Sequence, residues 1–122
     1  MLLDSNIFIY AIQTAHESLL LWCAKQDIRA SNITRLEVLG YPHLSEKDKT
    51  DFHRLFEQAE IYPVSSAIIE LAIQLRQQRK MSLGDAIIAA TALESQQTLV
   101  TRNAQDFNWV EGLKVLDPFI EL

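Results

Sequence analysis

Hydrophobic and polar residues form two kinds of segment along this chain. Short apolar runs bounded by polar residues predict buried strands, and segments with apolar residues three or four positions apart predict helices. On this basis we expect five strands, over residues 1–3, 28–31, 61–64, 98–101 and 114–116. Strands that alternate with helices along a chain indicate a parallel sheet, so the pattern predicts an α/β fold.

The predicted helices lie between these strands. The first follows Asp4, and the others cover residues 17–26, 32–39, a stretch from Ser45 to about Ala59, a long segment that opens at Ser65 or Ser66, and residues 82–97. Serine at a helix start accepts hydrogen bonds from backbone N–H groups that the helix leaves free. Residues 86–90 are all apolar, so we expect the last helix to be buried on most sides.

The length and composition are those of one packed domain over residues 1–122. Apolar residues make up 48% of the chain, and only three Gly and three Pro interrupt it, a balance that argues against disorder. The single cysteine, Cys23, lies in an apolar stretch and is expected to be a buried hydrophobic residue. No uninterrupted apolar run approaches the roughly 20 residues of a membrane span, and we expect a cytoplasmic protein.

The net charge limits how nucleic acid could bind. Eleven basic and sixteen acidic residues give a formal charge of −5, which repels phosphates at long range and argues against a general nucleic-acid coat protein. RNA would therefore need local basic patches or a metal ion. The candidate residues for a basic patch are Arg76, Arg79 and Lys80, which stand shortly before Asp85, and Arg102. A group of basic residues at the end of a helix is, however, more often only a solvated helix end.

Four acidic residues stand where open α/β sheets bind their ligands, beyond the carboxyl ends of the strands. Asp4 follows the first strand, Asp106 lies in the loop after the fourth, and Glu37 and Asp85 lie early on helices. Each also has a structural interpretation: Asp4 and Asp85 as helix caps, Glu37 as an exposed helix residue, and Asp106 as a loop acid. Together they predict a cluster of carboxylates at one edge of the sheet.

A carboxylate cluster costs stability unless a cation neutralises it. Oxygen ligands favour Mg²⁺ or Mn²⁺, and no His or Cys pair has the spacing of a zinc site. Such an ion binds a phosphate oxygen and lowers the pKa of a water, which are the requirements of phosphodiester hydrolysis. Thr101 and Asn103, directly after a buried strand, could orient a metal-bound water or a carboxylate, or only satisfy the loop backbone.

Several short motifs occur in order along essentially the whole chain. They are Asp4-Ser5-Asn6, the spaced residues Ser31, Thr34 and Glu37, the segment from Gly84 to Ala90, Val100-Thr101-Arg102-Asn103, and Asp106-Phe107. This combination resembles PIN-domain proteins of the VapC type, which are the toxin ribonucleases of bacterial toxin–antitoxin pairs.

The resemblance implies a three-layer α/β/α domain with a mostly parallel sheet of four to five strands. It also implies an acidic site that binds Mg²⁺ or Mn²⁺ and cleaves RNA, often tRNA or rRNA. Asp4, Glu37 and Asp85 take the places of the core acids, with Asn6 supporting them, and the fourth position falls on Asn103 or on Asp106. The family further implies a homodimer and a small antitoxin whose tail covers the acidic groove.

Two other functions compete with the nuclease. A catalytically silent PIN-like module could bind RNA or a protein, although the retained acids favour an enzyme. An aspartate-based phosphatase or receiver also uses an Asp after a strand together with Mg²⁺. A phosphatase of that type needs an acid two residues after Asp4, where Asn6 stands, and a receiver needs paired acids and a late Lys that are not evident.

Overall fold

The structure is a computed structural model that describes residues 1–122. Its strands are β1 (Leu2–Leu3), β2 (Arg29–Ser31), β3 (Glu60–Tyr62), β4 (Leu99–Val100) and β5 (Val115–Leu116). Its α-helices are α1 (Ser5–Ala11), α2 (Glu17–Ala24), α3 (Asn32–Leu39), α4 (Glu46–Glu57), α5 (Ser66–Gln78) and α6 (Leu83–Glu94). Three short 3-10 helices complete it, η1 (Thr14–His16), η2 (Ala104–Asp106) and η3 (Pro118–Ile120). The number and the order of the strands and α-helices are as predicted. The ends of these elements differ from the predicted ends by a few residues.

The five strands form one parallel sheet in the order β3-β2-β1-β4-β5. The chain moves outward from β1 to β2 and β3, and then returns to β4 on the other side of β1. The boundary between β1 and β4 is therefore the point where the strand order reverses, and such a point leaves a crevice at the carboxyl ends of the strands. Asp4 directly follows β1 at this position.

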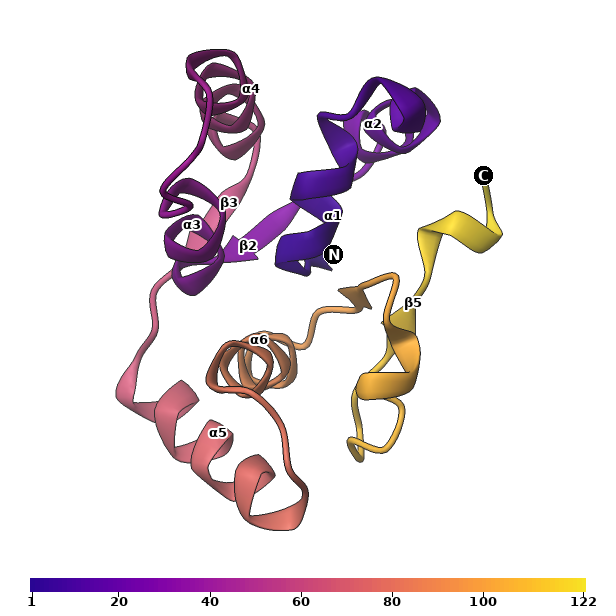
Figure 1. Ribbon diagram of the computed structural model, residues 1–122. Coiled ribbons are helices and arrows are strands. Elements are labelled where there is room, and N and C mark those ends of the chain that lie inside the picture. The colour runs from indigo at the N-terminus through magenta and orange to yellow at the C-terminus, as the bar shows by residue number, and fades with distance from the viewer.

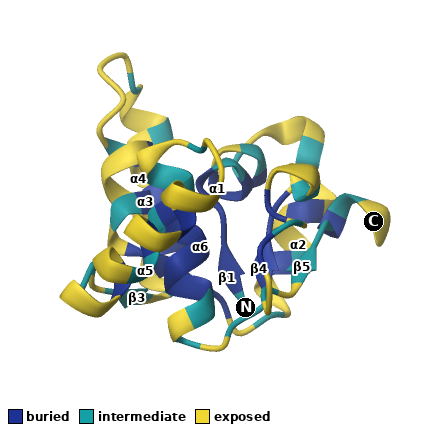
Figure 2. Cartoon of the chain, turned by 90° about the horizontal axis from the view of Figure 1, so that it is seen from below, coloured by how far each residue is buried: buried dark blue, intermediate teal, exposed yellow.

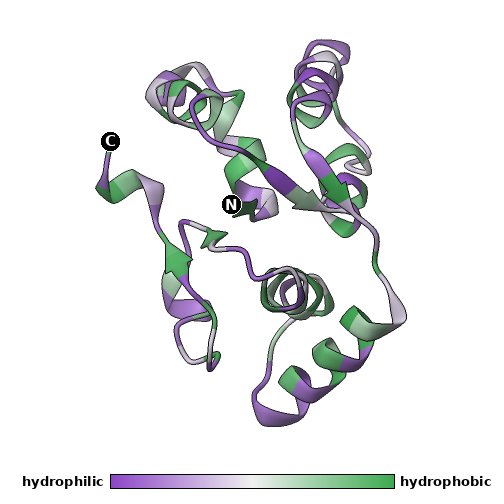
Figure 3. Ribbon diagram, turned by 180° about the vertical axis from the view of Figure 1, so that it is seen from behind, coloured by the Kyte–Doolittle hydropathy of each residue, from purple (hydrophilic) through white to green (hydrophobic).

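Helices cover both faces of the sheet, as the three-layer prediction requires (Figure 1). Successive strand residues point to opposite faces: Leu3 and Val100 belong to a core with α1, α2 and α4, whereas Leu2 and Leu99 belong to a second core with α5 and α6. Figure 2 shows β1, β4 and α6 as the buried centre of the molecule, and β4 and β5 are among the hydrophobic segments in Figure 3. The expected burial of residues 86–90 is confirmed, except that Ile87 is only partly buried.

The helices begin where the cap residues predicted. The side chains of Ser31, Ser45, Ser65 and Ser82 each accept a hydrogen bond from a backbone N–H in the first turn of the helix that follows. Cys23 is buried in the first core, as expected, and burial raises the pKa of its thiol to about 11. At neutral pH the thiol is therefore protonated and unreactive.

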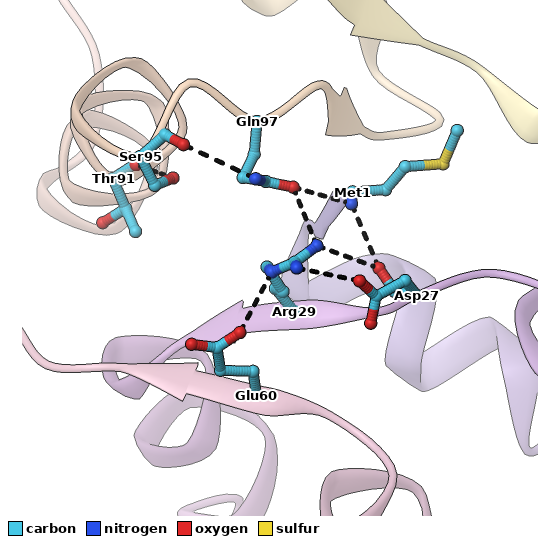
Figure 4. A network of polar contacts seen from close by, with 7 residues as sticks. All are labelled: Met1, Asp27, Arg29, Glu60, Thr91, Ser95 and Gln97. Carbon is cyan, nitrogen blue, oxygen red and sulfur yellow. Dashed lines mark hydrogen bonds and ion pairs between the residues drawn. The ribbon is translucent and has the colours of Figure 1, made fainter.

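A polar network closes the amino-terminal edge of the sheet (Figure 4). Arg29 forms ion pairs with Asp27 at 2.8 Å and with Glu60 at 3.1 Å, and its guanidinium also donates to Gln97 Oε1 at 3.1 Å. The same oxygen accepts a hydrogen bond of 2.9 Å from the amino group of Met1. Charges of both signs thus balance at this edge, whereas the acids predicted to carry chemistry lie at the opposite, carboxyl edge.

No single helix in this structure has both the length and the apolar character needed to cross a bilayer. Helix α1 and residues 14–24 meet these requirements only when they are taken together, and the two segments are bent by 102° relative to each other. The cytoplasmic location expected from the sequence stays a prediction.

Candidate active site

Asp4 is the most enclosed acid of the site, with 4% of its surface exposed. It caps α1, because its Oδ1 accepts a hydrogen bond of 2.8 Å from the backbone N–H of Ser5. Its Oδ2 accepts a second bond of 2.8 Å from the hydroxyl of Thr101, which follows β4. The helix-cap interpretation of Asp4 is therefore correct, and it is compatible with a place in the crevice between β1 and β4.

The electrostatic state of Asp4 reflects burial and neighbouring acids. Burial raises its pKa from the ordinary value of 3.8 to about 6; the hydrogen bond from Thr101 lowers the pKa, and the negative charges of Asp85 and Glu37 raise it. Burial also raises the pKa of Asp85, and the charges of Asp106 and Glu37 add to that rise. Asp4, Glu37 and Asp85 thus lie close enough for their charges to interact, and Asp106 interacts with Asp85.

Glu37 accepts a hydrogen bond from the hydroxyl of Ser5, which is itself bonded to the hydroxyl of Thr34. The hydroxyl of Ser5 lies 2.8 Å from Oε1 of Glu37 and 3.0 Å from the hydroxyl of Thr34. A carboxylate can only accept, so Ser5 donates its single proton to Glu37, and Thr34 donates to Ser5. Asp4 and Glu37 are therefore both bonded to one residue, Ser5, and the backbone and side chain of Ser5 fix their relative position.

Ser5 and Thr34 occur in the sequence motifs, but no role was predicted for either residue. Both are buried, and Thr34 stands three residues before Glu37 on α3. That spacing places the two side chains on one face of the helix. These roles could have been predicted from the sequence, because Ser5 stands beside Asp4 and Thr34 stands one turn before Glu37.

Gly84 brings Glu37 and Asp85 close together. A Cβ atom built on Gly84 would lie 2.6 Å from Oε2 of Glu37, so the carboxylate of Glu37 packs against the first turn of α6. Asp85 is the next residue of that turn, and its backbone N–H donates to Ser82 at 3.1 Å. The absence of a side chain at Gly84 thus leaves the room that the Glu37 carboxylate occupies beside Asp85.

The remaining predicted residues lie around these acids. Asp106 is exposed at the end of η2, and its charge acts on Asp85. Asn103 contributes a backbone hydrogen bond of 3.1 Å to the Thr101 hydroxyl, while its side chain is exposed. Asn6 is partly buried in the first turn of α1. Of the two residues considered for the fourth position, Asp106 is the one whose charge acts on another acid of the site, Asp85.

Three of the four predicted basic residues lie beside two of the acids. Arg76, Arg79 and Lys80 line a groove of about 720 Å³ together with Asp85 and Asp106. A second hollow, of about 740 Å³, lies among α1, α2 and α4 and contains none of the predicted site residues.

Arg102 lies apart from that groove. Its guanidinium lies over the ring of Phe119, 4.3 Å from the centroid, and 5.0 Å from the centroid of Tyr10. An RNA contact at Arg102 stays a prediction.

The donor chemistry of the acids fits a hard divalent cation. In the conformation described, no three His, Cys, Asp or Glu side chains are grouped closely enough to hold one ion, so binding requires at least one carboxylate to change its rotamer. The ligands available near Asp4 are carboxylate and hydroxyl oxygens, which suit Mg²⁺ or Mn²⁺. Burial and, to a smaller degree, repulsion between the acids raise the pKa of Asp4 and Asp85, and a bound cation would offset both effects.

Comparisons with known proteins agree with this fold. The family model of the PIN domain matches residues 1–112, so the chain belongs to the PIN domain family. Its VapC-type resemblance is supported by solved structures of toxin–antitoxin complexes. No curated protein matches the chain.

Three solved structures illustrate the similarity. A chain of a toxin–antitoxin complex from Klebsiella pneumoniae is 30% identical over 96% of both chains, with a TM-score of 0.77. FitAcB from Neisseria gonorrhoeae is 26% identical over 97% of both chains, also with a TM-score of 0.77. VapBC2 from Rickettsia felis, bound to a DNA fragment from its promoter, is 23% identical over 94% of this chain and 96% of that chain, with a TM-score of 0.81.

Proposed function

We propose that this protein is a Mg²⁺- or Mn²⁺-dependent endoribonuclease and the toxin of a toxin–antitoxin pair. The observation that carries the proposal is the position of Asp4. It is buried at the strand-order reversal and bonded to Thr101, and the charges of Glu37 and Asp85 reach it. Membership in the PIN domain family supports the assignment.

The residues of the site have two roles: some would bind the metal ion, and others hold the metal-binding carboxylates in place. Asp4, Glu37 and Asp85 bind the ion, with Asp106 as the fourth acid, while Ser5 and Thr101 fix the carboxylates by hydrogen bonds. When bound, the ion coordinates a phosphate oxygen and lowers the pKa of the attacking water. Asn6 in the first turn of α1 and the exposed Asn103 are the proposed supporting residues, whose amides would orient a water in the site.

The basic side of the groove binds the substrate. Arg76, Arg79 and Lys80 are exposed beside Asp85 and Asp106. Phosphate contacts from such residues position RNA without reading its sequence. A local cationic surface also offsets the net charge of −5 that otherwise repels RNA. The substrate class we propose is structured RNA, with tRNA and rRNA as the first candidates.

The proposed partner is a small antitoxin protein. Several structurally similar proteins are toxin–antitoxin complexes, and some were solved with DNA. By analogy, a segment of the antitoxin covers the acidic groove of this chain, and the toxin forms a homodimer. A gene for a small DNA-binding protein beside the gene for this chain would support the pairing.

An RNA cleavage assay tests the activity. Purified protein is mixed with a structured RNA in the presence of Mn²⁺, Mg²⁺ or excess chelator. We expect cleavage that the chelator stops and that Asp85→Asn slows about 100-fold or more. Glu94→Gln is the matched control, since Glu94 is an exposed acid at the other end of the same helix.

Two results contradict the proposal. Full cleavage with excess chelator would rule out the metal mechanism. RNA binding without cleavage in either metal would assign the chain to the silent PIN-like module. Circular dichroism of each variant verifies that the fold is retained.

A further inference from the structure

Two arginines at the carboxyl edge of the sheet each lie over aromatic rings. Arg102 lies over Phe119 at 4.3 Å and near Tyr10 at 5.0 Å, and Arg79 lies over Trp109 at 5.5 Å, all measured to the ring centroid. A guanidinium within about 6 Å of a ring centroid is attracted to the ring face. Such a contact holds the guanidinium by its attraction to the ring, and its N–H groups stay available to donate hydrogen bonds to another group.

These two arginines lie on opposite faces of the sheet. Tyr10 and Phe119 pack against the core that α1, α2 and α4 form with the sheet, whereas Trp109 packs against the core of α5 and α6. Arg102 directly follows Thr101, which bonds to Asp4, and Arg79 lines the groove that contains Asp85. Arg102 is thus next to the residue that bonds to Asp4, and Arg79 is beside Asp85 and Asp106, so each arginine adjoins a different part of the acidic site.

Neither arginine has an acidic partner within the chain. The ion pairs of the structure involve Arg29, Lys47 and Lys49 only, and the side chains of Arg79 and Arg102 form no hydrogen bonds. In a chain of net charge −5, two exposed guanidinium groups stay unneutralised beside a carboxylate cluster. Aromatic contacts, in place of carboxylates, hold them there.

We propose that Arg79 and Arg102 bind phosphates on the two sides of the scissile bond, so that an RNA strand crosses the carboxyl edge of the sheet from one face to the other. Trp109 and Phe119 are positioning residues that hold these arginines. This inference rests on the proposed ribonuclease function and adds the path of the strand. A bidentate guanidinium matches a phosphodiester well, and two fixed contacts align the bond between them over the acids.

RNA binding measured over a range of salt concentrations tests the two arginines. The probe is a fluorescein-labelled single-stranded RNA of about 16 nucleotides, and all proteins carry Asp85→Asn so that the RNA is not cut. We expect Arg102→Ala and Arg79→Ala each to weaken binding and to lower the slope of log K against log salt by about one. Arg54→Ala is the charge-matched control, since Arg54 is exposed in the last turn of α4.

Phe119→Leu separates positioning from charge. The leucine keeps an apolar side chain against the core but removes the ring face under Arg102. We expect binding to weaken about two- to fivefold, the strength of an exposed cation–π contact, with the salt slope unchanged because Arg102 keeps its charge. In the double variant with Arg102→Ala, Phe119→Leu should cause no further loss, since it acts through Arg102.

Cleavage by the Asp85-containing enzyme provides an independent measure. Arg102→Ala is expected to lower kcat/KM, because the lost phosphate contact weakens binding and also leaves the scissile bond less well aligned over the acids. Wild-type behaviour of both arginine variants, in a protein that still cleaves RNA with Mn²⁺, overturns the proposed strand path alone. A protein that neither binds nor cleaves RNA overturns the ribonuclease function as well. Loss of binding to a protein partner with RNA binding intact assigns the arginines to a protein interface and also overturns the proposal.

Discussion

The hydroxyl of Thr101 donates a hydrogen bond of 2.8 Å to Oδ2 of Asp4. Thr101 follows β4 and Asp4 follows β1, so this bond joins the two strands at the point where the strand order reverses. The same hydroxyl accepts a bond of 3.1 Å from the backbone N–H of Asn103. Thr101 therefore connects the buried acid to the start of the loop that carries Asp106.

Thr101→Val should destabilise the protein and weaken metal binding. The substitution keeps the shape of a fully buried side chain but leaves an oxygen of Asp4 and the N–H of Asn103 without a partner. An orphaned buried polar group costs about 1–3 kcal/mol, and loss of a residue that orients a ligand weakens metal affinity about 10- to 100-fold. Urea unfolding and Mn²⁺ titration measure the two effects.

Thr91→Val is the matched control for that substitution. Thr91 is equally buried, and its hydroxyl donates to the carbonyl of Ile87 within α6. We expect a smaller loss of stability than for Thr101→Val and an unchanged affinity for Mn²⁺. Equal effects of the two variants on Mn²⁺ affinity would show that Thr101 has no special relation to the site.

The stability of the metal-free protein should depend on the ionisation of Asp4. Its pKa is raised from 3.8 to about 6 by burial, so the folded state binds this proton more tightly than the unfolded state does. The contribution of Asp4 to the free energy of unfolding therefore falls as pH rises from about 4 to 6, and the cost is complete above pH 6. The rise in pKa corresponds to about 3 kcal/mol at most.

Asp4→Asn removes that cost. Above pH 7, in chelator, we expect the variant to be about 1–3 kcal/mol more stable than the wild type, and the difference should shrink as the pH falls to 5. Urea denaturation at several pH values measures it. A variant that is less stable by the same amount at every pH would contradict the assigned ionisation of Asp4.

Gly84→Ala should alter the site without harming the fold. The new Cβ would lie 2.6 Å from Oε2 of Glu37, so the flexible carboxylate must move. Alanine within a helix is favoured over glycine by about 1 kcal/mol, so thermal stability should be retained or raised. We expect weaker Mn²⁺ binding and slower RNA cleavage. Gly112→Ala does not serve as a control, because Gly112 has a φ of 81° that alanine adopts poorly.

The main features of the fold could be predicted because they depend on local pattern. Apolar runs and cap residues such as Ser45 and Ser82 are short-range signals, and each predicted strand and helix is present. Strand ends were less predictable: the expected strand at 61–64 is β3 at 60–62. β3 begins where Glu60 pairs with Arg29 of β2, and such a contact between distant residues is not visible in a local pattern.

The predicted acids could be located by their place after strands and at helix starts, but their contacts could not. The hydrogen bonds that connect Ser5 with Thr34 and with Glu37 join residues about thirty positions apart. The space beside Gly84 that the Glu37 carboxylate occupies depends on how α3 and α6 pack. Arg102 was predicted from its charge and its place before Asp106, yet its position depends on Phe119 near the end of the chain. Tertiary packing determines all of these relationships.

Direct Mn²⁺ binding tests the central claim, that Asp4, Glu37 and Asp85 hold one divalent ion. Electron paramagnetic resonance measures free Mn²⁺ during titration of the wild type, Asp4→Asn, Asp85→Asn and the control Glu94→Gln. We expect the wild type and Glu94→Gln to bind Mn²⁺ equally, and the two site variants to bind at least about 10-fold more weakly. Equal binding by all four proteins, or no binding by the wild type at millimolar Mn²⁺, would contradict the claim.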